Sequence, residues 1–219
     1  MQSSIPGVFI SLEGVDGSGK TTQAARLCAA LQRDGEHVLA TREPGGDSVS
    51  EAVRALVLAT DVTAPAELLL FLAARAQHVA IQLRPFLEAG GVLICDRYAD
   101  STVAYQGYGR GLDLDTIATI NRFATGGLMP HLTVLIDLDP KVGMARQQQA
   151  NRMEREPLAF HQRVRDGYAV MARAEPDRFA VFDGSLPSEQ LQESIYERAG
   201  AAIATIRGST ARITEGVIQ

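Results

Sequence analysis

Eight consecutive residues near the N-terminus have the composition and spacing of a polyphosphate-binding loop. They fit the pattern G-x-x-x-x-G-K-[ST] and read Gly14-Val15-Asp16-Gly17-Ser18-Gly19-Lys20-Thr21. Glycines let backbone N–H groups wrap phosphates, the lysine reaches the terminal phosphates, and the threonine hydroxyl can hold Mg²⁺. An apolar run, Val8–Leu12, precedes this loop, and a helical pattern follows it. A turn that merely starts a helix does not need the full pattern, so we predict a nucleoside triphosphate site at Gly14–Thr22.

An aspartate and an arginine end a second apolar run. Asp96 and Arg97 directly follow Gly91–Cys95. Ligands of open α/β sheets bind at the carboxyl ends of the strands, the edge that also carries the loop. Asp96 can therefore act as a metal-side carboxylate, and the planar guanidinium of Arg97 can hold a second phosphate. A strand-end salt bridge is the structural alternative. Asp137 is a rival aspartate at the end of another apolar run, but it has no neighbouring arginine.

Two further groups of residues leave alternatives open. Phe71, Arg75 and His78 have the spacing i, i+4, i+7 and share one helical face. An aromatic ring and a guanidinium there can stack on a base and bond its edge, or Phe71 can belong to the core while Arg75 reaches solvent. Arginines also gather before Pro157, in a segment with few core positions, where they form either a mobile lid or a solvated helical face. They are Arg146, Arg152 and Arg155.

Strand and helix patterns alternate along the chain, which predicts an α/β fold with a parallel five-stranded sheet and helices on both faces. Pro85 is expected to kink the longest helix or to begin its final turn. We expect one domain over residues 1–206 and leave the tail, 207–219, unassigned. The expected strands are Val8–Leu12, His37–Thr41, Gly91–Cys95, Leu132–Leu138 and Arg178–Phe182, and the expected helices are Thr21–Arg33, Glu51–Leu58, Ala66–Glu88, Lys141–Ala150, Leu158–Ala174 and Ser188–Ile206, with loop and helix between Tyr98 and Thr125.

Composition excludes several classes of protein. The chain has 219 residues, 46% of them apolar, and a net charge of −5, which excludes a disordered chain and argues against a general nucleic-acid coat. The longest apolar run, Leu68–Ala74, is too short to cross a bilayer. The first six residues lack the basic region of a secretory signal, and two cysteines are too few for a disulfide framework. We therefore expect a cytoplasmic protein without nucleic-acid or membrane partners, whose few placed arginines hold an anionic ligand.

Four segments occur in a fixed order along the chain. They are Val8-Phe9-Ile10-Ser11-Leu12-Glu13-Gly14-Val15-Asp16-Gly17-Ser18-Gly19-Lys20-Thr21-Thr22, Thr41-Arg42-Glu43-Pro44-Gly45-Gly46, Phe71-Leu72-Ala73-Ala74-Arg75-Ala76-Gln77-His78 and Asp96-Arg97-Tyr98-Ala99-Asp100-Ser101-Thr102-Val103-Ala104-Tyr105-Gln106-Gly107. Together they closely resemble the bacterial thymidylate kinases, over about residues 8–183. The resemblance implies a three-layer P-loop kinase fold with a short lid at about residues 146–157. It implies transfer of the γ-phosphoryl of Mg-ATP to dTMP, giving dTDP and ADP in dTTP synthesis, by a homodimer.

The resemblance also implies roles for single residues. Phe71 would stack on thymine, Arg75 would bond its edge, and Arg97 would hold the monophosphate. Asp16 would face the sugar and phosphate of the acceptor, beside the loop of Arg42 and Glu43. Further residues of the nucleoside pocket would be Ser101, Thr102, Tyr105 and Gln106; the catalytic set would be Lys20, Arg97, Arg152 and Asp16; and Thr21 and Asp96 would lie on the metal side.

Members of the family that this chain resembles differ in where their catalytic arginine lies. Eukaryotic-type members carry it in the P-loop, where this chain has Gly17, and bacterial-type members supply it from a mobile lid. Arg152 matches the lid position, although Asn151 stands where such lids often have aspartate. Which lid arginine reaches the phosphoryl group stays open at this point.

Two other functions compete with this interpretation. The acceptor can be another pyrimidine nucleotide or a deoxynucleoside. A GTP-dependent switch would also use the P-loop, but it is expected to carry an N-K-x-D motif. The chain has 21 basic residues, of which only Lys20 and Lys141 are lysines, and neither lies in such a motif.

Overall fold

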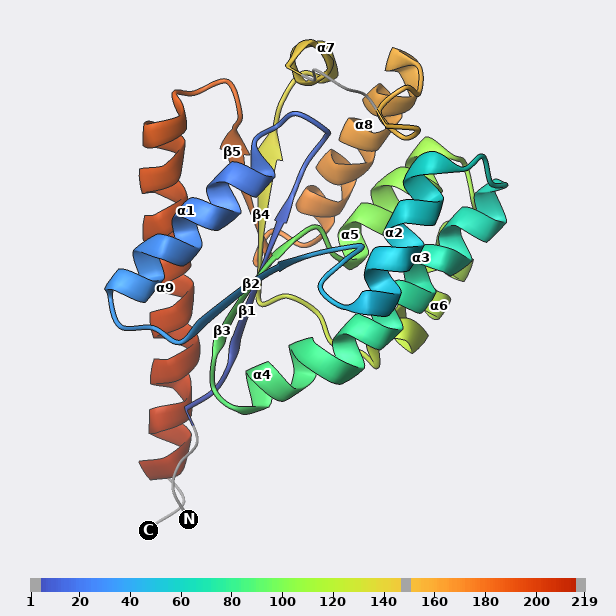
Figure 1. Cartoon of the computed structure of the whole chain (residues 1–219). Helices are drawn as coiled ribbons and strands as arrows, with labels where there is room; N and C mark the ends of the chain where they lie inside the picture. Colours follow the sequence, from blue (N-terminus) through green and yellow to red (C-terminus); the bar gives the residue numbers. More distant parts are fainter. Residues whose placement is uncertain (1–4, 147–150, 216–219) are drawn as a thin grey trace.

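The computed structural model describes residues 5–146 and 151–215, with side chains as far as Gly208. Its sheet has parallel strands in the order β2-β3-β1-β4-β5 (Figure 1). This arrangement confirms the predicted fold class, and each strand lies within one residue of its predicted bounds. The strands are β1 (Val8–Glu13), β2 (Val38–Arg42), β3 (Val92–Asp96), β4 (Leu132–Asp137) and β5 (Phe179–Asp183).

Helices cover both faces of the sheet. On one face α1 packs beside α9, and the remaining helices lie on the other face or at the carboxyl edge (Figure 1). None of the described helices is long and apolar enough to span a membrane. The helical elements are α1 (Lys20–Arg33), α2 (Ser48–Ala59), α3 (Ala64–His78), η1 (Val79–Leu83), α4 (Arg84–Glu88), α5 (Ala99–Thr102), η2 (Val103–Gly109), α6 (Leu114–Thr125), α7 (Pro140–Ala145), α8 (Leu158–Ala174) and α9 (Ser188–Glu215).

The predicted helix Glu51–Leu58 begins earlier in the structure, at Ser48, and three other predicted helices differ at their ends or in their interior. The predicted helix Ala66–Glu88 is divided by the π-helical turn η1, because Pro85 has no N–H to donate and its ring displaces the carbonyl four residues earlier. Pro85 thus lies in the first turn of α4, one of the two expected outcomes. The last helix continues to Glu215, past its predicted end. Of the predicted helix Lys141–Ala150, the part at 147–150 lies outside the described residues.

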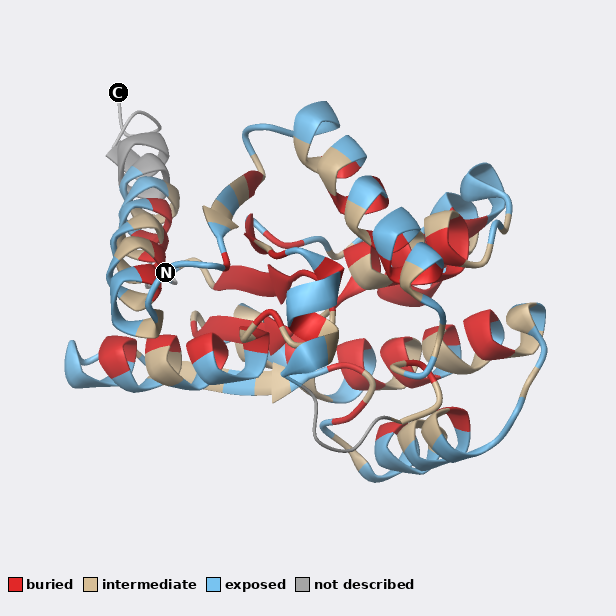
Figure 2. Ribbon diagram, turned by 90° about the horizontal axis from the view of Figure 1, so that it is seen from above, coloured by how far each residue is buried: buried red, intermediate tan, exposed pale blue. Residues whose placement is uncertain are grey.

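The core follows from the composition of the central strands. Every residue of β1 and of β3 is buried, as expected for parallel strands covered on both faces. Figure 2 shows these buried residues gathered along the strands and on the helix faces turned toward them. In the register of the sheet, Leu12 lies beside Asp96 and Glu13 beside Leu135. The loop after β1 and the turn after β3 therefore meet at one edge of the sheet.

Candidate active site

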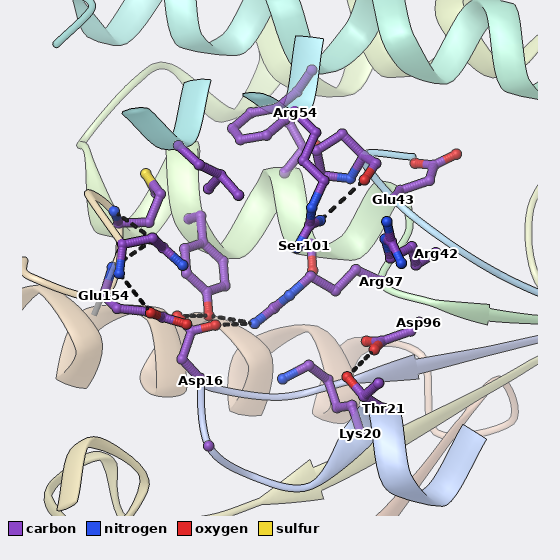
Figure 3. A pocket seen from close by; sticks show the side chains of 18 of the residues that line it. Asp16, Lys20, Thr21, Arg42, Glu43, Arg54, Asp96, Arg97, Ser101 and Glu154 are labelled. Carbon is purple, nitrogen blue, oxygen red and sulfur yellow. Dashed lines mark hydrogen bonds and ion pairs between the residues drawn. The ribbon is translucent and has the colours of Figure 1, made fainter. Parts of the chain in front are cut away.

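A cavity of about 480 Å³ opens at this carboxyl edge. It extends from the P-loop to the turn after β3 and to the inner face of α3, and the side chains of Asp16, Lys20 and Arg97 are directed toward one another within it (Figure 3). Most of the site residues expected from the sequence line it. They are Asp16, Gly17, Gly19, Lys20, Thr21, Thr22, Glu43, Phe71, Arg75, Asp96, Arg97, Ser101, Thr102, Tyr105 and Gln106, whereas Gly14, Val15, Ser18, Arg146, Arg152 and Arg155 do not line it.

Glycine is required at position 17 for a packing reason. Gly17 has φ +76°, and a Cβ built on it would lie 2.2 Å from the carbonyl oxygen of Gly143 in α7. A Cβ on Gly143 would likewise lie 2.2 Å from the carbonyl oxygen of Asp16. The two backbones approach too closely for any side chain, so an arginine at position 17 does not fit this chain.

Lys20 is the buried cation of the P-loop. Its ammonium donates to the carbonyl oxygen of Val15 at 2.8 Å and to Ser18 Oγ at 3.4 Å. Burial lowers the pKa of Lys20 to about 8, and the positive charge of Arg97 adds to this effect. A phosphate entering the cavity would meet a cation that has lost most of its hydration.

The hydroxyl of Thr21 and the carboxylate of Asp96, expected on the metal side, are in contact. Thr21 Oγ1 donates to Asp96 Oδ2 at 2.5 Å. Mg²⁺ prefers oxygen ligands and is usually held by one or two carboxylates together with substrate phosphates, which this pair fits. The structure contains no cluster of three or more His, Cys, Asp or Glu suited to a metal within 5–146 and 151–208. The rival Asp137 instead accepts two hydrogen bonds from Arg165, at 2.6 and 2.7 Å, and does not line the cavity.

Arg97 occupies a left-handed turn that directs it into the cavity. Among the described residues, Arg97 is the one non-glycine residue with a positive φ, of 71°. The guanidinium forms an ion pair with Asp16 and donates to Gly14 O, Ser101 Oγ and Tyr105 Oη at 3.1, 3.2 and 3.0 Å. Burial acts to raise the pKa of Asp16, but the charges of Arg97 and Lys20 and the hydrogen bond from Tyr105 together outweigh burial, and the pKa is lowered. Asp16 therefore stays ionised beside Arg97.

Arg75 lies at the other end of the cavity with most of its donors engaged. Nε donates to Glu43 at 2.7 Å, Nη1 to Thr102 and Asn121 at 2.8 and 2.7 Å, and Nη2 to the carbonyl of Tyr98 at 3.0 Å. A guanidinium has five N–H donors, so one on Nη2 is left for a ligand. Arg75 is 3% exposed, which excludes the alternative that it reaches solvent. Phe71 is half-buried on the same cavity wall.

Two of the three arginines expected in the lid are bound by other parts of the chain. Arg152 donates to the carbonyl of Val57 at 2.8 Å and forms an ion pair with buried Glu67. Arg146 donates to the carbonyl of Gly17 at 3.1 Å, which brings it to the P-loop. Arg155 is exposed and donates only to the backbone of its own turn, within the described residues.

Asn151 caps the turn that follows it, in the segment expected to form the lid. Its Oδ1 accepts from the backbone N–H groups of Met153 and Glu154 at 2.9 and 3.2 Å. Glu154 accepts in return from the backbone N–H of Asn151 at 2.8 Å. An amide oxygen performs this capping as a carboxylate would.

Several lining residues were missed by reasoning from the sequence. Arg54 of α2 is the most informative of them, since its Nη1 donates to the carbonyl of Pro44 at 3.1 Å and its charge lies on the cavity wall. Its position three residues after Glu51, on a short helix that follows the Arg42–Gly46 loop, is the signal that points to it. The others are Pro44, Leu58, Asn151, Met153 and Glu154.

Comparison with known proteins identifies the family. The family model described as Thymidylate kinase matches residues 12–195. The chain belongs to the thymidylate kinase family. A thymidylate kinase of Solidesulfovibrio magneticus is 48% identical over 206 residues, which cover 88% of this chain and 99% of that protein. One of Deinococcus radiodurans is 50% identical over 195 residues, covering 87% and 95%. A crystal structure of thymidylate kinase from Ehrlichia chaffeensis superposes with a TM-score of 0.74 at 34% identity, covering 89% and 99%.

Proposed function

We propose that this chain transfers the γ-phosphoryl group of ATP to dTMP, forming dTDP and ADP as a step of dTTP synthesis. The observation that carries the proposal is the extent of one cavity. It extends from Lys20 of the P-loop past Arg97, which would hold the acceptor phosphate, to Phe71 and Arg75, which would face the base. Membership of the thymidylate kinase family supports the same reaction.

The reaction asks the protein for placement and charge neutralisation. A phosphomonoester has a second pKa of about 6, so the acceptor is largely a dianion at neutral pH and needs no general base. Lys20 would bind the phosphates of ATP and Arg97 the phosphate of dTMP, which holds two anions together against their repulsion. Mg²⁺ held by Thr21 and Asp96 would neutralise charge on the transferred group. Asp16, ionised beside Arg97, would orient that guanidinium and face the acceptor.

The lid would supply the catalytic arginine, because Gly17 leaves no room for one in the P-loop. Arg152 is the first candidate from its position in the lid. To reach a phosphate it would have to exchange Glu67 and the carbonyl of Val57 for the ligand. Arg146 is the second candidate, because it already contacts the P-loop at Gly17.

Acceptor choice is the experiment that tests the proposal. ADP release from ATP would be measured with dTMP, dUMP and dCMP as acceptors. One methyl group enclosed beside Phe71 distinguishes thymine from uracil by only about 10–200-fold. Rejection of dCMP is expected to be stronger, because the free donor of Arg75 suits a carbonyl at the 4-position and not an amino group. Equal use of dCMP and dTMP would contradict the proposed role of Arg75 and favour a broader pyrimidine nucleotide kinase.

Two further features belong to the same proposal. The chain would act as a homodimer, since Phe123 on α6 and Leu69 on α3 are 88% and 60% exposed and these two helices pack against each other. Sedimentation of the wild type and of Phe123→Asp would test this, and a monomeric wild type would contradict it. The chain would also be cytoplasmic, where the two free cysteines, Cys28 and Cys95, stay reduced.

A further inference from the structure

Glu13 is a buried carboxylate at the end of β1 that does not line the cavity. It is fully buried and immediately precedes the P-loop. Its Oε1 accepts from the backbone N–H of Tyr98 at 2.7 Å. Its Oε2 accepts from Ser101 Oγ at 2.6 Å and from Tyr168 Oη at 2.7 Å. A carboxylate removed from water needs such partners, yet phosphoryl transfer as derived above does not use it.

These contacts place Glu13 beside the turn that carries Arg97. Arg97 adopts φ 71°, a conformation that a side chain rarely takes. Its own N–H donates to the carbonyl of Leu12 at 3.0 Å, and the next N–H, that of Tyr98, donates to Glu13. The end of β1 therefore accepts hydrogen bonds from the backbone N–H groups of Arg97, the residue with positive φ, and of Tyr98, the residue after it.

The side chain of Arg97 is connected to Glu13 as well. An ionised carboxylate only accepts hydrogen bonds, so the hydroxyl of Ser101 must donate to Glu13. The lone pairs of Ser101 are then directed at other donors, and Arg97 Nη1 donates to this oxygen at 3.2 Å. While Glu13 is ionised, the hydrogen bonds on this path all point the same way: Arg97 donates to Ser101, and Ser101 donates to Glu13.

We propose that Glu13 is a positioning residue for the acceptor phosphate, which holds the backbone of Arg97 through Tyr98 and its guanidinium through Ser101. The inference rests on the proposed function, in which Arg97 binds the phosphate of dTMP. Glu13 acts through Arg97 and touches neither substrate.

The surroundings of Glu13 place its ionisation near neutral pH. Burial raises the pKa of Glu13 to about 7, and Asp100 on α5 adds to the rise, while Ser101, Arg97 and Tyr168 oppose it. The other groups that act on it electrostatically are Lys20 on α1, Arg75 on α3 and Cys95 in β3. A protonated Glu13 donates a hydrogen bond itself, so it can no longer accept from the hydroxyls of both Ser101 and Tyr168. Positioning of Arg97 is therefore expected to weaken as the pH falls through about 7.

Steady-state kinetics with each substrate varied in turn test the inference. Glu13→Ala is expected to raise KM for dTMP by about 10–100-fold, the loss of a hydrogen bond to a charged group, with KM for ATP within about twofold of wild type. Glu13→Gln has the hydrogen-bonding groups of protonated Glu13, an acceptor for Tyr98 and a donor toward Ser101 and Tyr168. It is therefore expected to raise KM for dTMP less than Glu13→Ala does, to the level that the wild type reaches well below pH 7. Tyr168→Phe removes the second hydroxyl donor to Glu13, which also lies 2.9 Å from Ser101 Oγ. Because Ser101 keeps its bonds to Glu13 and to Arg97, KM for dTMP is expected to rise less than in Glu13→Ala.

A pH profile adds a readout that a merely structural role would not move. In the wild type, kcat/KM for dTMP is expected to decrease as the pH is lowered through about 7. In Glu13→Gln it is expected to change only with the ionisation of the acceptor, at about pH 6. A Glu13→Ala variant in which kcat falls and the KM values for dTMP and ATP rise by equal factors would overturn the inference. So would a pH profile of Glu13→Gln identical to that of the wild type. If Glu13→Ala does not fold, Glu13→Gln and its profile decide. An Arg97→Ala variant with unchanged KM for dTMP would instead contradict the proposed function of Arg97.

Discussion

The turn after β3 and the lid segment both present arginines near one cavity, but they hold them differently. Arg97 points into the cavity, and its partners are the P-loop, α5 and η2. Arg152 does not line it, and its partners are α2 and α3. The side proposed to bind the acceptor is therefore organised by the sheet itself. In the proposed reaction Arg152 would have to exchange its partners before it could act.

The difference has a local cause in each region. The turn follows a buried strand whose register with β1 is fixed, so the position of Arg97 is set by Leu12 and Glu13. The lid segment is anchored by the cap at Asn151 and by Glu67, a single buried carboxylate shared with Arg110. Both arginines form an ion pair, but that of Arg97 joins two loops that leave adjacent strands of the sheet, whereas that of Arg152 joins the segment after α7 to helix α3.

The largest expected effect concerns the lid. Arg152→Ala is expected to lower kcat by about 10³-fold or more with little change in dTMP affinity, the pattern of a contact made mainly in the transition state. Glu67→Gln is the control, because it removes the same ion pair while keeping the arginine. Stopped-flow or steady-state turnover measures both. A loss of kcat in Glu67→Gln as large as in Arg152→Ala would show that the ion pair is structural.

Arg146→Ala and Arg155→Ala sharpen the same prediction. Arg146 contacts the carbonyl of Gly17, so its removal would mainly raise KM for ATP. Arg155 is exposed and is expected to change kcat by less than about twofold. Wild-type kcat in all three arginine variants would place the catalytic arginine outside the lid.

Lys20→Ala is expected to lower kcat by about 10²–10³-fold, the effect of removing one preorganised donor to developing charge. The fold should persist, because the ammonium binds only the carbonyl of Val15 and the hydroxyl of Ser18 among the described residues. Circular dichroism verifies the fold and a coupled ADP assay gives the rate. Turnover near that of the wild type would remove Lys20 from the site.

The smallest expected effect is a pH dependence on the ATP side. The pKa of Lys20 is lowered to about 8 by burial, so the ammonium is charged below this pH and loses its proton above it. Consequently kcat/KM for ATP, which reports the free enzyme, is expected to fall as the pH rises through about 8. Lys20→Arg, which stays charged, is the comparison. A decline of equal size and midpoint in Lys20→Arg would assign the titration to another group.

Reasoning from the sequence succeeded where the signal is local. The strands, the P-loop and the residues after β3 follow from hydrophobic runs, glycine spacing and strand ends, all of which act over a few residues. It failed to predict the partners of Arg152 and Arg75, because Glu67 lies 85 positions from Arg152 and Glu43 lies 32 positions from Arg75. Such pairs depend on how elements pack, and the helical period carries no information about this. Arg54 was missed for the same reason.

Calorimetric titration of dTMP into the wild type, Arg97→Ala and Arg152→Ala tests the difference between the two regions most directly. If the turn after β3 is the organised acceptor site, the affinity for dTMP falls in Arg97→Ala, the affinity for ATP does not, and Arg152→Ala binds dTMP as the wild type does. Equal losses of dTMP and ATP in Arg97→Ala, or a loss of dTMP binding in Arg152→Ala as large as in Arg97→Ala, would contradict it.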